Sequence, residues 1–550
     1  MRVCRLTNSR WRMRSRCLTI IGALLTPWHA ERTVAQEFPA VWITTATSSA
    51  SYTPVVRSPS LGTLNHAEFN ALWQRTAEDE YELYVAAKVP IRQIWFPWPA
   101  TPVMEGGTFL YPHLLGIDID QRKFADRPWA WFGEDYPDWR YPGQCFAPLI
   151  LQHDRSQGWC HMLAAANWPP KPVRVLCCKD RMALRYEAPI AAGTTATFRA
   201  IMGPTQNWMT AVDRYREWLD PHVAEDDLAP RYPPHMQLSN GRVCFHLQNY
   251  EPADDARNKL ERWSNDLGSM FPHFSLWGQQ SGWVGPDPRN QYPGTGCCQP
   301  TADWHPRYTP WLEAFAEDWV REGGQISFYS GAVGPFADNL EALWWWTVLN
   351  RSTIPYIDVF AYRPWPDPLA AAQWTKALGA VPILEGTCDI YPAAFDCSNA
   401  FSHRSADGTH TPFPPFGRYL LRDRILYAGL NGDGYYWGPE AGYAAERRAF
   451  QYGIKLDVAW PYELNGSLDE GMVEVVRAWE RSDFWSREPV YIGEVDTLPP
   501  NTRGSLFRGA DGRRLLVFDQ WDEPRLRRVY AGRKSVTVPA ERLWVAVLDR

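Results

Sequence analysis

The feature that constrains this chain most is a regular alternation of apolar runs and amphipathic segments between residues 235 and 484. Runs such as HFSLWG, QISFYSG and AVPILEG have the length of strands. Between them, TPWLEAFAEDWVREGG and DPLAAAQWTKALG carry apolar residues at helical spacing and end on glycine, a frequent helix stop. Strands alternating with helices predict a parallel sheet, and about 250 residues is the size of a (β/α)8 barrel. No G-x-G-x-x-G follows the first strand, so a dinucleotide-binding sheet is the weaker alternative.

The region before the alternation has a different pattern of apolar and polar residues. Residues 36–206 hold short runs of alternating apolar and polar side chains broken by turn residues, which predicts an N-terminal antiparallel β-sandwich. Within it, residues 69–84 are interpreted as a helix. Residues 207–234 predict a second helix, with Trp208 and Tyr215 on its apolar face, and then an acidic, proline-rich linker.

The two ends of the chain predict a leader and a third domain. Residues 485–550 return to short strands, with a hairpin signal in GADGRRLLVF, and predict a small C-terminal β-sandwich. Residues 1–35 combine an arginine-rich start, the apolar stretch CLTIIGALLTPWHA and a small-residue cleavage site after Ala35. We therefore expect a signal peptide and export, to the periplasm or outside the cell. No later stretch reaches 18 consecutive apolar residues, so we expect no integral membrane segment in the mature chain.

The composition favours a carbohydrate ligand over a nucleic acid. The net charge is −6 and no basic stripe is present, which argues against nucleic-acid binding. Aromatic residues make up 14% of the chain, with 30 Trp. Indole and phenol rings offer an apolar face with a polar edge, which suits the C–H faces and hydroxyls of sugar rings. Most of these aromatics are expected to fill cores, and a minority to contact an oligosaccharide or polysaccharide substrate.

The cysteines predict neither a disulfide framework nor a metal site. Two of the 11 lie in the leader, and the remaining nine cannot all pair. The adjacent pairs Cys177–Cys178 and Cys297–Cys298 lack the spacing of a zinc site. Cys388 and Cys397 bracket a short loop that a local bridge would close in an exported protein. We expect most of the others to be small buried residues, and we expect no metal or cofactor.

Two carboxylates end apolar strand runs in the central region. Asp358 follows IPYI and Glu385 follows VPIL, 27 residues later, which is the length of one βα unit. Burying an unpaired carboxylate costs several kcal/mol. A carboxylate at such a position is therefore expected to have an ion-pair partner or a catalytic role. Neighbouring strands lie roughly 4.8 Å apart, which predicts roughly 5–6 Å between the two carboxyl groups. That separation is typical of a retaining glycoside hydrolase, whereas an inverting enzyme needs roughly 6.5–9.5 Å. The alternative is a buried ion pair with Arg363 or Arg422.

The surroundings of the two carboxylates suggest a role for each. Tyr362 and Arg363 follow Asp358 closely and favour its ionised form, as a nucleophile requires. Glu385 has the longer side chain and is expected to act as acid/base. The reverse assignment of the two roles is the alternative. Other polar and aromatic residues near the predicted strand ends are candidates for substrate binding: His246, Gln248, Trp277, Trp283, Asp287, Tyr329, Tyr362, Arg363, Arg422 and Trp437.

Several short motifs together resemble a known group of enzymes. They are the W-x-x-A-x-x-x-Y-x-x-W helix from Trp208 to Trp218, LWG with a downstream YPG, YIDVF at the fourth strand and ILEG at the fifth. Over roughly residues 95–480 the chain resembles bacterial barrel proteins related to the endo-α-N-acetylgalactosaminidases of glycoside hydrolase family 101 and, more distantly, α-galactosidases. The resemblance implies that Asp358 is the nucleophile and Glu385 the acid/base. The chain departs from the family pattern in two respects. Its N-terminal sandwich is shorter, and the strand after Glu385 carries no clear family motif. α-Galactosidases usually pair two Asp residues, and the Glu here departs from that pattern too.

The sequence therefore predicts an exported glycoside hydrolase that cleaves an α-linked, galactose- or GalNAc-type glycan with retention. An inverting or substrate-assisted variant is an alternative within this class. A non-catalytic glycan-binding barrel protein is the alternative from another class, and it has no need of the carboxylate pair.

Overall fold

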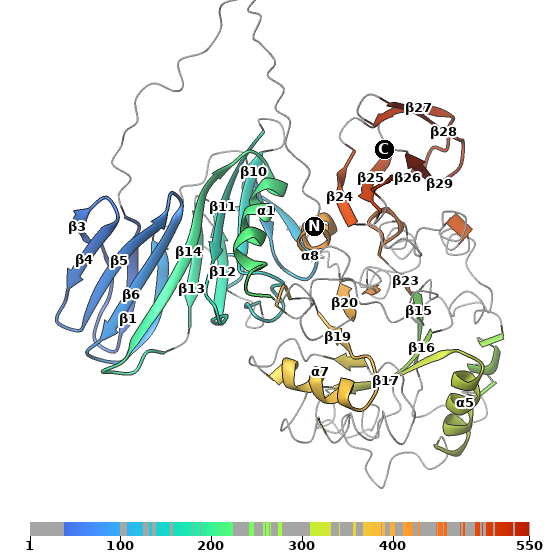
Figure 1. Cartoon of the computed structure of the whole chain (residues 1–550), viewed down its shortest axis with the longest axis horizontal. Coiled ribbons are helices and arrows are strands. Elements are labelled where there is room, and N and C mark those ends of the chain that lie inside the picture. The colour runs from blue at the N-terminus through green and yellow to red at the C-terminus, as the bar shows by residue number, and fades with distance from the viewer. Residues whose placement is uncertain are drawn as a thin grey trace, which may run out of the picture. The chain divides into compact units, whose positions relative to one another are not determined.

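The computed structural model describes a large part of the chain between Phe38 and Leu548 (Figure 1). The described residues are 38–98, 107–124, 131–134, 139–154, 158–179, 181–187, 189–223, 241–246, 257–258, 260–262, 264–265, 273–277, 309–331, 340, 356–358, 367–386, 388–390, 397–401, 411–421, 427–429, 447, 449–454, 456–458, 474, 477–478, 490–495, 498, 502–509, 512–531 and 534–548. For the strands of the central region, apart from 325–327 and 383–384, the description covers the backbone.

Two antiparallel sheets form the N-terminal part, as predicted. The smaller one has the order β12-β13-β7-β1-β2, with β1 Ala40–Thr45, β2 Ser49–Tyr52, β7 Ile91–Trp98, β12 Val173–Cys178 and β13 Arg181–Tyr186. The larger one has the order β21-β9-β8-β10-β11-β14-β6-β5-β4-β3. Its strands are β3 Val55–Ser58, β4 Leu61–Asn65, β5 Phe69–Ala77, β6 Glu80–Ala87, β8 Thr108–Tyr111, β9 Ile117–Asp120, β10 Leu149–Asp154, β11 Trp159–Ala165, β14 Thr195–Thr205 and β21 Thr411–Pro412. A short 3-10 helix, Gln121–Phe124, follows β9.

The two sheets share one hydrophobic core. Tyr111 of β8 donates its hydroxyl hydrogen to the carbonyl of Val175 in β12 at 2.7 Å, which ties the larger sheet to the smaller. The ring of Tyr186 in β13 lies 4.7 Å from that of Phe198 in β14. In strands such as β5, alternation gives one buried face toward this core, whereas β10 and β13 are buried at nearly every residue.

The prediction of a helix over residues 69–84 is wrong. The segment forms the hairpin of β5 and β6, in which Leu72 pairs with Tyr84. Phe69, Ala71 and Trp73 are buried on one face of β5 while the residues between them are exposed or half-buried. This period of two is the pattern of a strand with one face in the core.

The predicted helix after the sandwich is confirmed as α1, Trp208–Leu219. Asn207 caps its start by accepting a hydrogen bond from the backbone N–H of Thr210 at 2.9 Å, which satisfies one of the free donors of the first turn. The buried residues Trp208, Ala211, Val212, Tyr215 and Leu219 repeat at helical spacing.

The central region forms an eight-stranded sheet in which every pairing is parallel. Its order is β22-β20-β19-β18-β17-β16-β15-β23, and the two end strands, β22 and β23, also lie close to each other. The strands are β15 Gly241–His246, β16 His273–Trp277, β17 Gln325–Gly331, β18 Tyr356–Asp358, β19 Ile383–Glu385, β20 Cys397–Phe401, β22 Tyr427–Gly429 and β23 Leu456–Val458. The predicted parallel sheet is thus confirmed.

Helices separate several of these strands, as expected for a parallel sheet. They are α5 Thr309–Arg321 before β17, α7 Asp367–Ala377 between β18 and β19, and α8 Pro414–Leu421 between β20 and β22. Gly323 and Gly379, just past α5 and α7, have positive φ angles of 90° and 83°, the conformation that ends many helices. Among the described residues, no helix is long and apolar enough to cross a membrane.

The C-terminal residues form short antiparallel strands. Four of them, β24 Val490–Glu494, β25 Arg503–Arg508, β26 Arg514–Asp519 and β29 Leu543–Leu548, make one sheet in that order. β27 Arg527–Ala531 and β28 Lys534–Val538 pair with each other. The predicted hairpin in GADGRRLLVF is confirmed, because β25 and β26 pair from Arg508 opposite Arg514.

Candidate active site

The backbone brings the two predicted catalytic carboxylates to neighbouring strand ends. Asp358 is the last residue of β18, and Glu385 is the last residue of β19. These strands are parallel partners, with Ile357 opposite Leu384, so the next residue on each strand falls at the same level. In a parallel pair, residues at the same level project from the same face of the sheet, and their strands run about 4.8 Å apart. Asp358 and Glu385 are therefore adjacent on one face of the sheet.

The same level continues onto the strands on either side. Gly331 at the end of β17 lies opposite Asp358, and Asn399 of β20 lies opposite Glu385. Tyr427 of β22 lies opposite Asn399. In the backbone register, Asp358 and Glu385 are thus flanked by Gly331 on one side and by Asn399 and then Tyr427 on the other. We name Gly331, Asp358, Glu385, Asn399 and Tyr427 the carboxylate row.

Three predicted substrate-binding residues share the level just below the carboxylate row. His246 of β15 lies opposite Trp277 of β16. The pairing of β16 with β17 brings Trp277 level with Tyr329, which lies opposite Tyr356 of β18. Since Tyr356 precedes Asp358 by two residues, this level lies on the same face of the sheet as the carboxylate row. The predicted site residues Gln248, Trp283, Asp287, Tyr362, Arg363, Arg422 and Trp437 lie outside the described residues.

Sequence reasoning missed Asn399 and Tyr427. The stretches around them, CSNAF and ILYAGLNG, carry apolar runs of at most four residues. Such runs are too short to show a period, so neither strand was predicted clearly. The sequence offered one signal for these residues, which is a polar and an aromatic residue spaced by one βα unit. Residues of these types are common in loops as well, so the signal is weak.

The loop that follows Glu385 is fixed by a buried carboxyl group. Gly386 has a positive φ of 82° and turns the chain as it leaves the strand. Asp389, three residues later, is only 2% exposed. Its Oδ2 accepts a hydrogen bond from the hydroxyl of Tyr215 in α1 at 2.6 Å, and Tyr141 donates another to the same carboxyl group. Its backbone N–H donates to the carbonyl of Phe146 at 2.8 Å.

The protonation of Asp389 is set by this environment. Burial raises its pKa to about 7, because a charged carboxylate loses hydration there, while the hydrogen bonds from Tyr215 and Tyr141 act in the opposite direction. Burial also raises the pKa of Tyr141, Tyr215 and Cys388 well above their ordinary values. Asp389 is therefore the one group of these four that changes charge near neutral pH.

Helix α1 connects the N-terminal sheets to two segments around the strand ends. Besides the bond from Tyr215 to the loop after β19, α1 contacts α8, which precedes β22. The hydroxyl of Tyr419 donates to Asp213 of α1, at 2.9 and 3.0 Å from its two carboxylate oxygens. The ring of Trp208 packs edge-on against Tyr419 and Phe413. Contacts from one helix thus fix the backbone beyond both β19 and β20.

The hypothesis of a bridge between Cys388 and Cys397 is wrong. Cys388 is a free, buried thiol, and its Sγ lies 3.6 Å from Oδ1 of Asp389. Cys145, Cys160, Cys177 and Cys178 are also buried and form no disulfide, which confirms their prediction as small core residues. Burial raises the pKa of Cys145 and of Cys160 to about 12, so both are neutral thiols at neutral pH. In the part of the chain that the structure describes, no cluster of three or more His, Cys, Asp or Glu has the arrangement of a metal site.

Comparisons with known proteins leave the chain without an assigned family. No protein-family model matches it, and no curated protein matches it. Among solved structures, a GH31 α-xylosidase from a soil metagenome is 9% identical, over 90% of this chain and 99% of that one, with a TM-score of 0.43. An α-amylase from Geobacillus thermoleovorans is 10% identical, over 57% and 97% of the two chains, with a TM-score of 0.37. An α-galactosidase I from Mortierella vinacea is 8% identical, over 54% and 85%, with a TM-score of 0.35. Similarity at this level assigns neither a reaction nor a substrate to the chain.

Proposed function

We propose that this protein is a glycoside hydrolase whose catalytic pair is Asp358 and Glu385. The observation that carries the proposal is the register of β18 and β19, which places both residues at the same level on adjacent strand ends. Carboxyl groups on neighbouring strands lie about 5–6 Å apart, the range in which a retaining glycosidase places its nucleophile and its acid/base.

We further propose that the eight parallel strands close into a (β/α)8 barrel. The pairing of β15 with β23 and the proximity of β22 to β23 support this closure. The carboxylate row would then lie at the carboxyl end of the barrel, where barrel enzymes hold their catalytic groups. The level of His246, Trp277 and Tyr329 would lie one layer deeper and supply contacts to a sugar ring.

The proposed reaction proceeds in two displacements. Asp358 attacks the anomeric carbon while Glu385 donates a proton to the departing glycosidic oxygen, and a covalent glycosyl–Asp358 ester forms. Glu385 then removes a proton from water, which attacks the anomeric carbon and releases Asp358. Two inversions give net retention. The resemblance of YIDVF and ILEG to family 101 motifs favours an α-linked, galactose- or GalNAc-type substrate. We also propose export to the periplasm or the medium, on the basis of the leader-like residues 1–35.

The test is turnover of a panel of aryl α-glycosides that includes 4-nitrophenyl α-galactoside and α-N-acetylgalactosaminide. We expect the wild type to hydrolyse at least one of them, with proton NMR showing the α anomer as the first product. Asp358→Asn and Glu385→Gln are each expected to lower kcat by at least about 10³-fold, because each removes one function of the pair.

The matched control is Asp367→Asn, which changes a carboxylate in the first turn of α7 rather than at a strand end. It is expected to keep wild-type kcat. Near-wild-type turnover by both catalytic variants would refute the mechanism, and a β anomer as first product would refute retention. Glycan binding without turnover by the wild type would favour the non-catalytic alternative.

A further inference from the structure

A second cluster of aromatic and charged residues lies on one face of the five-stranded sheet. Trp42, Trp95, Arg185 and Arg174 stand opposite one another across β1, β7, β13 and β12, so they project from the same face. Their neighbours along the strands, including Val41, Ile43, Ile94 and Leu184, are at most 2% exposed and belong to the core. Trp95 is itself only 9% exposed and belongs to the core, so the cluster joins the core on one side and reaches solvent at its half-buried members.

A β-bulge adds another tryptophan to this face. Trp98 lies opposite Ala40, and Trp95 lies opposite Trp42, so that β7 uses three residues where β1 uses two. Without the irregularity, residues three apart in a strand would project from opposite faces. The bulge instead brings both indoles to one side, and their ring centres are 5.4 Å apart. Bulges often re-aim a side chain in this way near functional sites.

Four indoles meet in this cluster. The ring of Trp98 lies 5.3 Å from that of Trp42, and the ring of Trp131 lies 5.3 Å from that of Trp95 and 6.2 Å from that of Trp98. Trp131 comes from the segment that runs along the edge strand β12, where Phe132 bridges to Cys177. Trp42, Trp98 and Trp131 are each only half-buried. We name Trp42, Trp95, Trp98, Trp131, Arg174 and Arg185 the tryptophan–arginine face.

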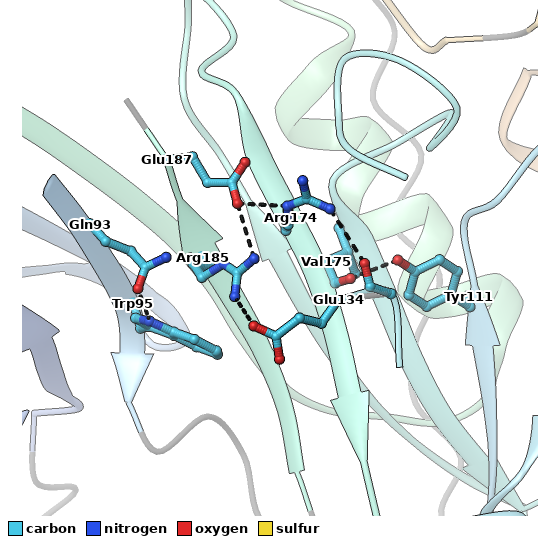
Figure 2. Close-up of polar contacts among 9 residues, drawn as sticks. Gln93, Trp95, Tyr111, Glu134, Arg174, Val175, Arg185 and Glu187 are labelled. Atoms are coloured by element: carbon cyan, nitrogen blue, oxygen red, sulfur yellow. Dashed lines mark hydrogen bonds and ion pairs between the residues drawn. The ribbon is translucent and has the colours of Figure 1, made fainter. Parts of the chain in front are cut away.

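Polar groups are held in fixed positions beside these rings (Figure 2). Arg185 donates from Nη1 to Glu134 at 2.6 Å and from Nη2 to Glu187 at 3.0 Å, and Arg174 donates from Nε to Glu187 at 2.6 Å. The guanidinium of Arg185 also lies over the ring of Trp95, 5.3 Å from its centre. The side chains of Arg174 and Arg185 are 11% and 9% exposed, while those of Glu187 and Glu134 are 32% and 46% exposed.

This arrangement differs from ordinary packing in two ways. The exposed carboxylates keep lone pairs free for a ligand, because each oxygen can accept more than one hydrogen bond. The indole N–H groups of Trp95 and Trp42 are used by Gln93 and Ser49, at 3.1 and 3.0 Å. No described residue accepts a hydrogen bond from the indole N–H of Trp98 or Trp131. Flat apolar faces beside free donors and acceptors are what a sugar ring requires.

The charges indicate which kind of sugar fits. Arg174 and Arg185 are balanced by the two glutamates that they contact, so this pair of arginines offers no uncompensated positive charge to a sulfate, a phosphate or a uronate. A third arginine, Arg181, holds its guanidinium over the ring of Trp98, 6.0 Å from its centre. From this geometry we propose that the tryptophan–arginine face is a non-catalytic binding site for a neutral oligosaccharide. It is separate from the carboxylate row, so binding here does not depend on the proposed catalytic function.

Affinity electrophoresis of the full chain tests the proposal. The protein carries Asp358→Asn and Glu385→Gln, so that the gel polysaccharide is not degraded. Native gels contain galactomannan, pullulan or xyloglucan as neutral probes, or dextran sulfate as an anionic probe. We expect retardation by at least one neutral polysaccharide. Trp98→Ala and Trp131→Ala are each expected to weaken that retardation at least tenfold, because each removes one stacking surface and one donor.

The matched control is Trp168→Ala, which removes an indole from the connection between β11 and β12 that is 40% exposed and lies beside His222. It is expected to keep full retardation. Thermal melting establishes that the variants are folded, and Glu134→Gln supplies a test that leaves all indoles in place and is expected to weaken binding too. The proposal is overturned if no neutral polysaccharide retards the protein, if only dextran sulfate does, or if folded Trp98→Ala, Trp131→Ala and Glu134→Gln bind like the control.

Discussion

Asp358→Ala and Glu385→Ala are expected to lose activity in different ways. The difference shows which residue is the nucleophile and which is the acid/base. Removal of the nucleophile abolishes the first displacement, so Asp358→Ala is expected to lower kcat by about 10⁴-fold or more for every aryl α-glycoside. Removal of the acid matters only where the leaving group needs a proton. Glu385→Ala is therefore expected to cost about 10²–10⁴-fold with poor leaving groups and much less for the first step with 2,4-dinitrophenolate.

Azide gives a second readout of the same assignment. In Glu385→Ala, azide needs no base and attacks the glycosyl–Asp358 ester, so the glycosyl azide is expected to retain the α configuration. In Asp358→Ala, azide takes the place of the missing carboxylate in a single displacement, so the β-glycosyl azide is expected. NMR of the azide product distinguishes the two. If the products are exchanged between the variants, the roles of Asp358 and Glu385 are exchanged as well.

The position of the carboxylate pair followed from local sequence, because both residues belong to one βα unit. Each carboxylate directly ends an apolar run, and 27 residues suffice for a strand, a helix and the return to the neighbouring strand. In the structure, α7 occupies the middle of that unit, and β18 and β19 pair as required. The parallel-sheet interpretation and the adjacency of the pair therefore needed no information from distant parts of the chain.

The hairpin of β5 and β6 shows where local preference misleads. The segment from Phe69 to Tyr84 is rich in Ala, Leu, Glu, Gln and Arg, which favour helices in isolation. Packing decided otherwise, since only the alternation of Phe69, Ala71 and Trp73 fits a sheet with one face in the core. Where helix propensity and the spacing of apolar residues disagree, the spacing is the better guide, because it reflects which residues are buried in the fold.

The buried position of Asp389 could not have been predicted from its surroundings in the sequence. DIYP after a strand reads as an exposed turn, and an aspartate is expected to face water there. Its hydroxyl partner, Tyr215, lies 174 residues earlier in the chain, on the apolar face of α1. A contact over such a separation is set by the packing of α1 and leaves no local signature.

Asp389 is expected to make the stability of the folded chain depend on pH. Its pKa is raised from 3.8 to about 7 on folding, so between these values the folded chain keeps a proton that the unfolded chain releases. Stability therefore falls as pH rises through this window and is constant above it with respect to this group. A difference of about three pH units corresponds to up to ~4 kcal/mol.

Asp389→Asn removes this titration and keeps an oxygen that accepts from Tyr215. Relative to wild type, the variant is expected to gain free energy of unfolding between pH 4.5 and pH 8, by up to ~4 kcal/mol, because the wild type must bury a carboxylate at the upper end. Urea unfolding followed by fluorescence at several pH values measures the gain. Tyr141, Tyr215 and Cys388, the titratable groups around Asp389, stay neutral across this range, since burial raises the pKa of each.

Tyr215→Phe and Asp213→Asn complete the experiment. The phenylalanine removes the 2.6 Å hydrogen bond to the carboxyl group and is expected to lower stability at pH 8 by about 1–3 kcal/mol, more than at pH 4.5, because a hydrogen bond to a charged acceptor is the stronger one. Asp213 also accepts from a tyrosine, but its side chain is 49% exposed, so its replacement is expected to change stability by a similar small amount at both pH values. A constant difference between Asp389→Asn and wild type across the pH range would show that Asp389 does not titrate in this window. The loop beyond Glu385 would then be fixed by a permanently protonated or permanently ionised group.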